Sequence, residues 1–329
     1  IFTGDFVFVG DIGRPDLLEN AAGMIGTKEI GAHQMYQSLQ HFLALPDHIQ
    51  VWPAHGAGSA CGKALGAVPS STVGYEKIRN WALQYQNNET AFVEELLSGQ
   101  PEPPRYFAMM KKLNKIARPL QTAVPQYKKL TNETFLRLYH KGTTIIDTRH
   151  KFEFAKGYLP NSINIQHNKT FNTWAGWILN YTDPFILIVE ESQLDDITRK
   201  LMRIGLDHVA GYITPDTIPH LGIPLEHQQL IGFEEMNSVL GKSDIQILDV
   251  RNAAEFSEGH LPHAAHIFVG TIADNLNQID RSKQLYLHCQ SGDRATIAAS
   301  ILAKNGIKDV KIYSPSINEW KLKGGTLVQ

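Results

Sequence analysis

The sequence contains only two cysteines, Cys61 and Cys289, in 329 residues. They lie far apart in the chain, which argues against a disulfide scaffold and for a reducing compartment, so we expect the cytoplasm. We expect no signal peptide and no membrane attachment, because no apolar run in the sequence is long enough to cross a bilayer. Because the net charge is only −2 at pH 7, nothing indicates a nucleic acid as a partner.

The length exceeds that of one ordinary domain, which predicts two or three domains. Apolar residues make up 43% of the chain and charged residues 19%, as in soluble globular proteins. The first residue, Ile1, lies inside a strand-like run and is not a methionine. We therefore expect the chain to be a fragment of a longer protein.

The most informative stretch is residues 285–294 (LYLHCQSGDR), in which an apolar strand-like run ends at Cys289. A helix pattern follows over residues 295–304. A tight loop between a strand and a helix directs backbone N–H groups inward, towards the positive end of the helix dipole. Such a ring of amides stabilises an anion at its centre, so the pattern predicts a reactive thiolate at Cys289.

A cysteine after an apolar strand is more often a small buried hydrophobic residue. Three features favour a catalytic role instead. Gly292 permits a tight curl of the loop, Arg294 adds a fixed positive charge, and no aliphatic residue follows Cys289. We therefore assign Cys289 and Arg294 as catalytic. The residues between them are assigned to substrate binding: Gln290, Ser291, Gly292 and Asp293.

Residues 289–294 resemble the active-site loop of the rhodanese family of sulfurtransferases. A second signature of that family is matched by residues 248–251 (LDVR) and 255–265 (EFSEGHLPHAA). Relatives of the same fold that act on phosphate or arsenate have a loop one residue longer. The resemblance therefore implies sulfur transfer through a persulfide on Cys289, in preference to phosphatase chemistry.

A second copy of this pattern lies roughly a hundred residues upstream. Its matching segments are residues 145–149 (IIDTR), 157–160 (GYLP) and 185–189 (FILIV). This copy contains no cysteine, and residues 190–193 (EESQ) stand where the active loop would be. Two carboxylates repel an anionic sulfur donor, so we expect this copy to be inactive and to serve as a spacer that positions its neighbours or pads an interface.

The first part of the chain pairs a carboxylate with a histidine. Residues 1–5 and 6–11 are predicted to form two short strands, and a strand over residues 49–53 leads to His55. Asp5 and His55 thus follow consecutive strands, as a metal site with oxygen and nitrogen ligands requires. By themselves they are equally consistent with an ordinary turn aspartate and a loop histidine.

Three motifs here resemble the C-terminal half of a metallo-β-lactamase fold, closest to glyoxalase II and the persulfide dioxygenases. They are residues 2–5 (FTGD), 10–16 (GDIGRPD) and 53–56 (PAHG). The resemblance implies that Asp5 is a metal ligand and that His55 is the last histidine of the metal site. In dinuclear members of the family that histidine binds the second metal, and in mononuclear iron dioxygenases it lies beside the site without binding the metal. The resemblance also places Arg14 near the site, where it would support the substrate pocket or the fold.

The His-x-His-x-Asp-His run that defines this family is absent from the chain, although the chain has 14 histidines. The chain therefore supplies part of a metal site. The resemblance implies non-haem iron as the cofactor, with zinc as the alternative and one or more ligands missing from this chain. Behind this region, helices are predicted over residues 27–45, 75–97 and 106–116, and a linker over residues 118–125.

We predict an α/β protein: the C-terminal half of a metallo-β-lactamase αββα sandwich followed by two rhodanese-like domains with parallel sheets. The predicted domains are residues 1–120, a cysteine-free copy at 126–222, and an active copy at 229–329. Strands that alternate with helices favour parallel sheets, in which ligands bind at the carboxyl ends of strands.

The order of these domains resembles that of bacterial persulfide dioxygenase–sulfurtransferase proteins. This implies an enzyme of sulfide detoxification that oxidises a low-molecular-weight persulfide to sulfite and transfers sulfur through Cys289. The expected partners are that persulfide and thiosulfate or sulfite, in a homo-oligomer. Two alternatives remain open: a zinc-dependent thioester hydrolase like glyoxalase II, and a non-enzymatic persulfide carrier or scaffold.

Overall fold

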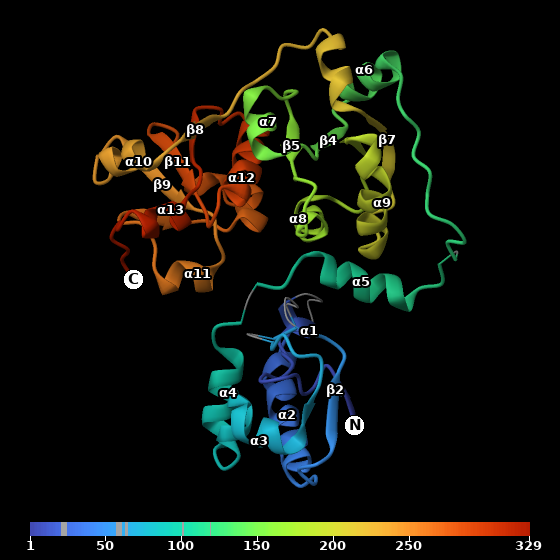
Figure 1. Cartoon of the computed structure of the whole chain (residues 1–329), viewed down its shortest axis with the longest axis vertical. Helices are drawn as coiled ribbons and strands as arrows, with labels where there is room; N and C mark the ends of the chain where they lie inside the picture. The colour runs from blue at the N-terminus through green and yellow to red at the C-terminus, as the bar shows by residue number, and fades with distance from the viewer. Residues whose placement is uncertain (21–24, 57–60, 63–64, 101, 119) are drawn as a thin grey trace. The chain divides into compact units, whose positions relative to one another are not determined.

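The computed structural model describes residues 1–20, 25–56, 61–62, 65–100, 102–118 and 120–329. The chain divides into two compact units, Ile1–Ala108 and Met109–Gln329 (Figure 1). Residue 119 of the predicted linker lies outside the described residues. Among the described residues, no helix is both long and apolar enough to cross a membrane.

The first unit contains one three-stranded sheet among its described residues. Strand β1 (Phe2–Gly4) pairs in parallel with β2 (Gln50–Pro53), which pairs antiparallel with β3 (Ser71–Thr72). Val51 of β2 shares a core with Leu39 and Phe42. The helices of this unit are α1 (Leu17–Asn20), α2 (Thr27–Leu43), α3 (Val73–Arg79), the 3₁₀ helix η1 (Trp81–Tyr85) and α4 (Glu89–Leu97), and α5 (Tyr106–Lys115) follows them.

The strand expected over residues 6–11 is wrong. These residues form a tight turn, in which the Phe8 N–H donates to the Asp11 carbonyl at 2.9 Å and Gly10 has a φ of +76°. Val7 and Ile12 pair across it in an isolated antiparallel bridge, and the Gly13 N–H donates to the Phe6 carbonyl at 2.8 Å. The chain reverses too soon for a strand to form.

The continuous helix expected over residues 75–97 is also wrong, because two asparagines divide it. Asn80 ends α3, and its side-chain oxygen accepts the Ala82 N–H at 3.2 Å to start η1. The Asn88 side chain likewise accepts the Ala91 N–H at 3.1 Å at the start of α4. Asparagine side chains compete with the helix backbone for hydrogen bonds and so end or start helices. The apolar pattern of the sequence runs through these boundaries and does not reveal them.

The second unit contains two parallel sheets, as predicted. The first has the strand order β5-β4-β6-β7 and the second has the order β10-β9-β11-β12-β8. The strands are β4 (Thr144–Asp147), β5 (Ser162–Asn164), β6 (Phe185–Ile188), β7 (Val209–Ile213), β8 (Gln229–Ile231), β9 (Ile245–Asp249), β10 (Ala264–His266), β11 (Gln284–His288) and β12 (Val310–Tyr313). The α-helices are α6 (Asn132–His140), α7 (Lys151–Lys156), α8 (Phe171–Ile178), α9 (Leu194–Arg203), α10 (Phe233–Val239), α11 (Ala253–Glu258), α12 (Asp293–Lys304) and α13 (Ile317–Leu322).

The internal repeat extends to individual side chains. In the first copy, the Arg149 guanidinium forks onto Asp147 and also donates to the Gly157 carbonyl at 3.0 Å. In the second copy, Arg251 forks onto Asp249 and donates to the Gly259 carbonyl at 2.8 Å. In each copy the arginine thus connects the aspartate at the end of one strand to the glycine that follows the next helix.

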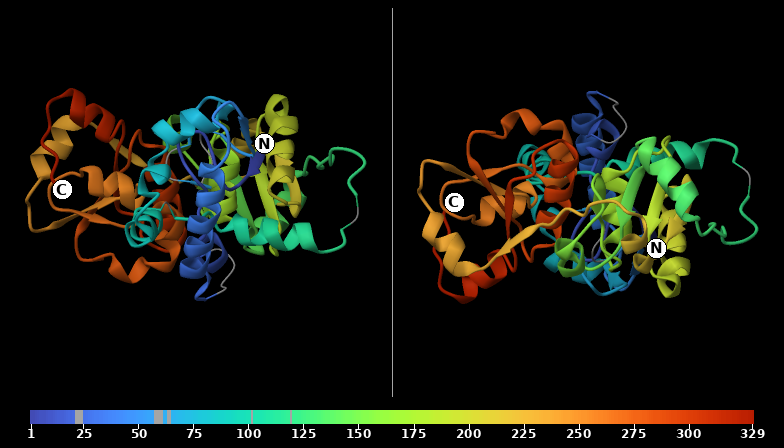
Figure 2. Two further views of the ribbon diagram at one scale, coloured as in Figure 1. Left: turned by 90° about the horizontal axis from the view of Figure 1, so that it is seen from below. Right: turned by 90° about the horizontal axis from the view of Figure 1, so that it is seen from above.

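The two copies contact each other through α12 of the second copy and β5 of the first (Figures 1 and 2). Strand β5 is an edge strand, and the backbone N–H of Asn164 donates to Ser300 Oγ at 3.2 Å. The helix thus covers a sheet edge that would otherwise leave backbone groups unpaired. As a result, the N-terminus of α12, where the Cys289 loop ends, lies beside the cysteine-free copy.

Candidate active site

Cys289 directly follows β11, a central strand of the second sheet, and the loop ends where α12 begins at Asp293. The backbone N–H of Gly292 donates to Cys289 Sγ at 3.1 Å, which is one of the inward-facing amides that the sequence predicts. Gly292 has a φ of +97°, which a residue with a Cβ rarely adopts. The loop therefore curls back so that a backbone donor meets the sulfur.

Cys289 is buried, although no aliphatic residue follows it. A second loop covers it. Ser316 Oγ accepts the Cys289 N–H at 3.0 Å and donates to the Tyr313 carbonyl at 2.5 Å. The side-chain amide of Gln290 donates to Asn318 Oδ1 at 2.6 Å, and the Asn318 N–H donates to the Gln290 carbonyl at 3.2 Å. The thiol therefore lies in a polar, hydrogen-bonded loop even though it is buried.

Arg294 is held by Glu255 of α11. Its two terminal nitrogens donate to the two carboxylate oxygens at 2.5 and 2.7 Å. Burial by itself disfavours the charged guanidinium, but the hydrogen bonds to Glu255 and the nearby Cys289 and Asp249 raise the pKa of Arg294. Arg294 thus carries a fixed positive charge that interacts electrostatically with Cys289 while its guanidinium is paired with Glu255. Glu255, which binds Arg294, belongs to the segment 255–265 that resembles the second rhodanese signature. It was not assigned to the site from the sequence alone.

Ser291 and Asp293 contact a residue of the other copy. The ammonium of Lys151, the first residue of α7, donates to the Ser291 carbonyl and to Asp293 Oδ1, each at 2.6 Å. Lys151 and Ser316 were both missed from the sequence. Lys151 lies two residues after the Asp-x-Arg segment that the two copies share, but nothing in the sequence connects it to a loop 140 residues away.

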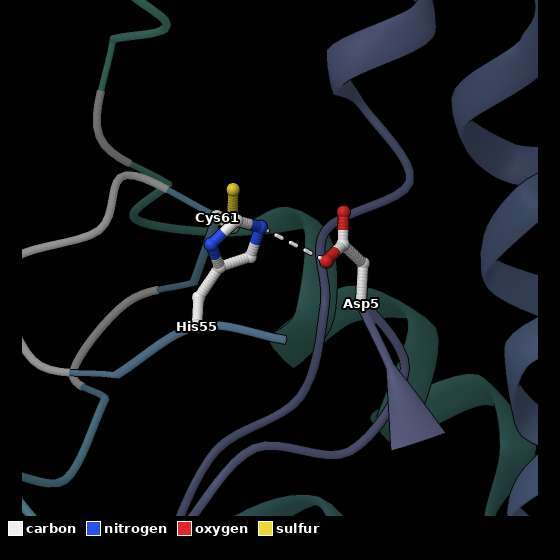
Figure 3. A group of neighbouring side chains, drawn as sticks. All are labelled: Asp5, His55 and Cys61. Carbon is white, nitrogen blue, oxygen red and sulfur yellow. Dashed lines mark ion pairs between the residues drawn. The ribbon is translucent and has the colours of Figure 1, made fainter. Parts of the chain in front are cut away.

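In the first unit, the structure brings Asp5 and His55 together. His55 Nε2 lies 3.0 Å from Asp5 Oδ1, and Cys61 is the third member of the group (Figure 3). One ligand atom from each residue lies within 4.8 Å of the other two. Cys61 was also missed; the only sequence signal is its position in the small-residue stretch that follows His55 (GAGSACG).

Strand pairing positions the side chains of Asp5 and His55. Gly4 at the end of β1 is in register with Pro53 at the end of β2, and the Ala54 N–H donates to the Gly4 carbonyl at 3.0 Å. Gly13 packs against the segment that carries Asp5, because a Cβ on Gly13 would lie 1.8 Å from the Asp5 carbonyl oxygen. The two side chains therefore extend from the same edge of the sheet.

Arg14 is buried, and its guanidinium forks onto Asp16, with donor–acceptor distances of 2.8 and 2.6 Å. This pairing favours the support of the fold, one of the two roles that the resemblance implied. A role of Arg14 in substrate binding stays a prediction.

The rhodanese-like domain family matches residues 131–213 and 233–323, more than half of the chain. The chain belongs to the rhodanese family. The second match includes Cys289 and its loop, and the first covers most of the cysteine-free copy.

Two curated relatives of this rhodanese protein are sulfurtransferases. A tRNA sulfurtransferase of Aliivibrio fischeri is 36% identical over 97 residues, which are 28% of this chain and 20% of that protein. The thiosulfate sulfurtransferase GlpE of Pseudomonas savastanoi is 29% identical over 87 residues, which are 26% of this chain and 82% of that protein. The chain therefore spans only a fifth of the first relative's length.

A solved structure, a metallo-β-lactamase from Staphylococcus aureus, is 42% identical with a TM-score of 0.55. The similarity covers 65% of this chain and 57% of that chain. The first part of the rhodanese protein accordingly corresponds to a metallo-β-lactamase fold, as predicted. Asp5, His55 and Cys61 form a group that could hold a metal ion, because one potential ligand atom of each lies within 4.8 Å of the other two. The carboxylate of Asp5 and the imidazole of His55 suit either iron or zinc.

His288, the last residue of β11, is fully buried. Its Nε2 lies 3.7 Å from Asp249 Oδ2, which is longer than a hydrogen bond. Burial lowers the pKa of His288 to about 4, although Asp249 acts in the opposite direction. The imidazole is therefore neutral in the folded protein at neutral pH.

This burial predicts a loss of stability in mild acid. Above pH 6.5 the imidazole is neutral in both states. Between about 6.5 and about 4 the unfolded chain binds a proton that the folded protein does not, so the free energy of unfolding falls as the pH falls. Between pH 7.5 and 5.0 we expect the wild type to lose about 2 kcal/mol more than His288→Gln. Denaturant unfolding of both proteins at the two pH values checks this, and parallel losses would contradict it.

Proposed function

We propose that this rhodanese protein is a sulfurtransferase that carries sulfane sulfur as a persulfide on Cys289. The observation that carries the proposal is the contact between the Gly292 N–H and Cys289 Sγ, in a loop that leads directly to Arg294 in the first turn of α12. A backbone donor and a fixed positive charge favour a thiolate, which is the nucleophile in such reactions.

In the first half-reaction, the Cys289 thiolate attacks the outer sulfur of thiosulfate. A Cys289–sulfur bond forms, the sulfur–sulfur bond of thiosulfate breaks, and sulfite leaves with the bonding electron pair. In the second half-reaction, a thiolate or cyanide takes the terminal sulfur, and the Cys289 thiolate is regenerated. The Gly292 N–H and the charge of Arg294 offset the negative charge that remains on the protein after each step.

We propose further that the first unit contributes to the oxidation of a low-molecular-weight persulfide by dioxygen. The reaction balances as RSSH + O₂ + H₂O giving RSH, sulfite and two protons. Asp5 would hold a non-haem iron together with two histidines from outside this chain, with His55 beside the site, and the iron would supply the chemistry that activates dioxygen. Sulfite formed in this way is an acceptor for the sulfur on Cys289, and their reaction yields thiosulfate.

The deciding experiment measures three quantities on the protein that includes the complete metal site. They are iron and zinc content, oxygen uptake on a supplied persulfide, and conversion of thiosulfate and cyanide to thiocyanate. Iron with oxygen uptake supports the proposal. Zinc without oxygen uptake supports a thioester hydrolase, and absence of thiocyanate turnover supports a carrier role for Cys289.

Asp5→Ala is expected to lower the metal content and oxygen uptake of that protein while thiosulfate:cyanide transfer is unchanged. The reason is that Asp5 and Cys289 lie in separate compact units, so the two losses should be independent. Metal analysis after dialysis checks the first part. Asp16→Ala is the control, because Asp16 pairs with Arg14 in the same unit. Equal metal content in Asp5→Ala and the wild type would remove Asp5 from the ligand set.

A further inference from the structure

Lys151 connects the cysteine-free copy to the active loop of the other copy. Its ammonium donates to the Ser291 carbonyl and to Asp293 Oδ1, and its own backbone N–H donates to Gln166 Oε1 at 3.0 Å. The lysine side chain is only 10% exposed. Lysine is almost never buried to this degree unless it is paired, so both partners in the loop matter for its placement.

The carbonyl that Lys151 binds belongs to the same peptide group as the N–H that meets the sulfur. Ser291 C=O and Gly292 N–H are the two polar ends of one planar trans unit, so they point in opposite directions. The Lys151 ammonium lies at the carbonyl end, and Cys289 Sγ lies at the N–H end at 3.1 Å. A cation at the carbonyl end fixes the orientation of this plane and polarises the N–H towards the sulfur.

Lys151 also offsets a charge that would oppose sulfur transfer. Asp293 stands at the start of α12, one residue after Gly292, and an unpaired carboxylate there would repel an anionic sulfur donor. Two further carboxylates near Cys289 already have partners of their own, since Glu255 binds Arg294 and Asp249 binds Arg251. Asp293 is the acidic group of the loop itself, and the cation that pairs with it comes from the other copy.

We propose that Lys151 is a positioning residue for sulfur transfer at Cys289. The cysteine-free copy then supplies one wall of the active loop, a chemical role beyond the spacing that the sequence predicted. The inference rests on the proposed sulfurtransferase function of Cys289. It concerns the orientation of the Ser291–Gly292 peptide and the neutralisation of Asp293.

The test compares Lys151→Met with Lys304→Met. Lys304 also joins the two copies from α12, because its ammonium donates to Thr144 Oγ1 at 3.1 Å, but it is at the other end of the helix. Lys151→Arg tests whether a second cation rescues the loop, and Lys151→Gln repeats the loss of charge with a polar side chain if the methionine variant does not fold. The readouts are kcat and KM for thiosulfate:cyanide transfer and the pH dependence of Cys289 alkylation by iodoacetamide.

We expect kcat to fall about tenfold in Lys151→Met and Lys151→Gln, because the charged hydrogen bond that orients the Ser291–Gly292 peptide is lost. We also expect the pH dependence of Cys289 alkylation to move to higher pH in these two variants. Lys304→Met should have the kcat and the alkylation profile of the wild type, and Lys151→Arg should recover at least half of the lost kcat. An unchanged profile and kcat in the Lys151 variants, or an equal effect of Lys304→Met, would overturn the inference. If the wild type forms no thiocyanate, the proposed function fails, while the alkylation profiles still decide the role of Lys151.

Discussion

Replacement of Cys289 by serine is expected to lower thiosulfate:cyanide transfer by at least about a thousandfold, because a hydroxyl retains its proton at a pH where a few per cent of thiols are ionised. The Gly292 N–H that lies 3.1 Å from the sulfur can still find an oxygen acceptor in the variant. Serine is also slightly smaller than cysteine, so it fits the buried site. The chemistry is therefore lost while the loop is retained.

Thiocyanate formation measures the loss, and mass spectrometry of the wild type after thiosulfate treatment should show one added sulfur atom on the peptide that contains Cys289. Cys61→Ser is the control, since Cys61 lies in the first unit. It should leave thiosulfate:cyanide transfer unchanged. A Cys289→Ser protein that keeps more than a few per cent of the activity would show that another group accepts the sulfur.

The strand, loop and helix around Cys289 could be predicted from the sequence because their signals are local. A strand, a cysteine, a glycine and a helix start lie within ten residues, and strand–loop–helix geometry follows from their order. The same holds for Asp5 and His55: each follows a strand of a parallel pair, so strand register brings the two together. Local order and sheet topology were sufficient in both cases.

Lys151 and Ser316 were missed because tertiary packing, and not local order, brings them to the loop. Ser316 reaches Cys289 across the sheet from the segment after β12, and Lys151 reaches it from another copy of the fold. Contacts between residues so far apart in the chain produce no repeating pattern and no fixed residue spacing in the sequence. The helix over residues 75–97 failed for a related reason, since the side-chain hydrogen bonds of Asn80 and Asn88 overrode the apolar pattern.

Gly292→Ala should produce the second largest loss among these variants. With φ at +97°, an alanine would be strained in any surroundings, and its Cβ would lie 2.3 Å from Ser314 Oγ and 2.9 Å from Ser314 Cβ. Such strain typically amounts to about 1–3 kcal/mol. The contact with Ser314 adds to it, so the loop must shift.

The shift would move the peptide that joins Ser291 to Gly292, and with it the N–H that faces Cys289 Sγ. We therefore expect thiosulfate:cyanide transfer to fall about a hundredfold, as expected when a preorganised backbone donor is displaced from a developing charge. The unfolding free energy should fall by only about 1–3 kcal/mol, so the protein stays folded. Turnover and denaturant unfolding on the same samples separate the two effects.

Gly306→Ala is the matched control, because Gly306 follows the other end of α12 with a φ of +81° and no atom within 4 Å of a built Cβ. It carries the same kind of backbone strain without a clash, and it is far along the helix from the thiol. We expect it to lose stability but to keep its turnover. Adding Ser314→Gly to Gly292→Ala removes the clash and leaves the strain, so turnover should recover in part. If Gly292→Ala and Gly306→Ala have equal turnover, the loop does not depend on the curl at Gly292, and sulfur transfer must be supported by groups other than its amide.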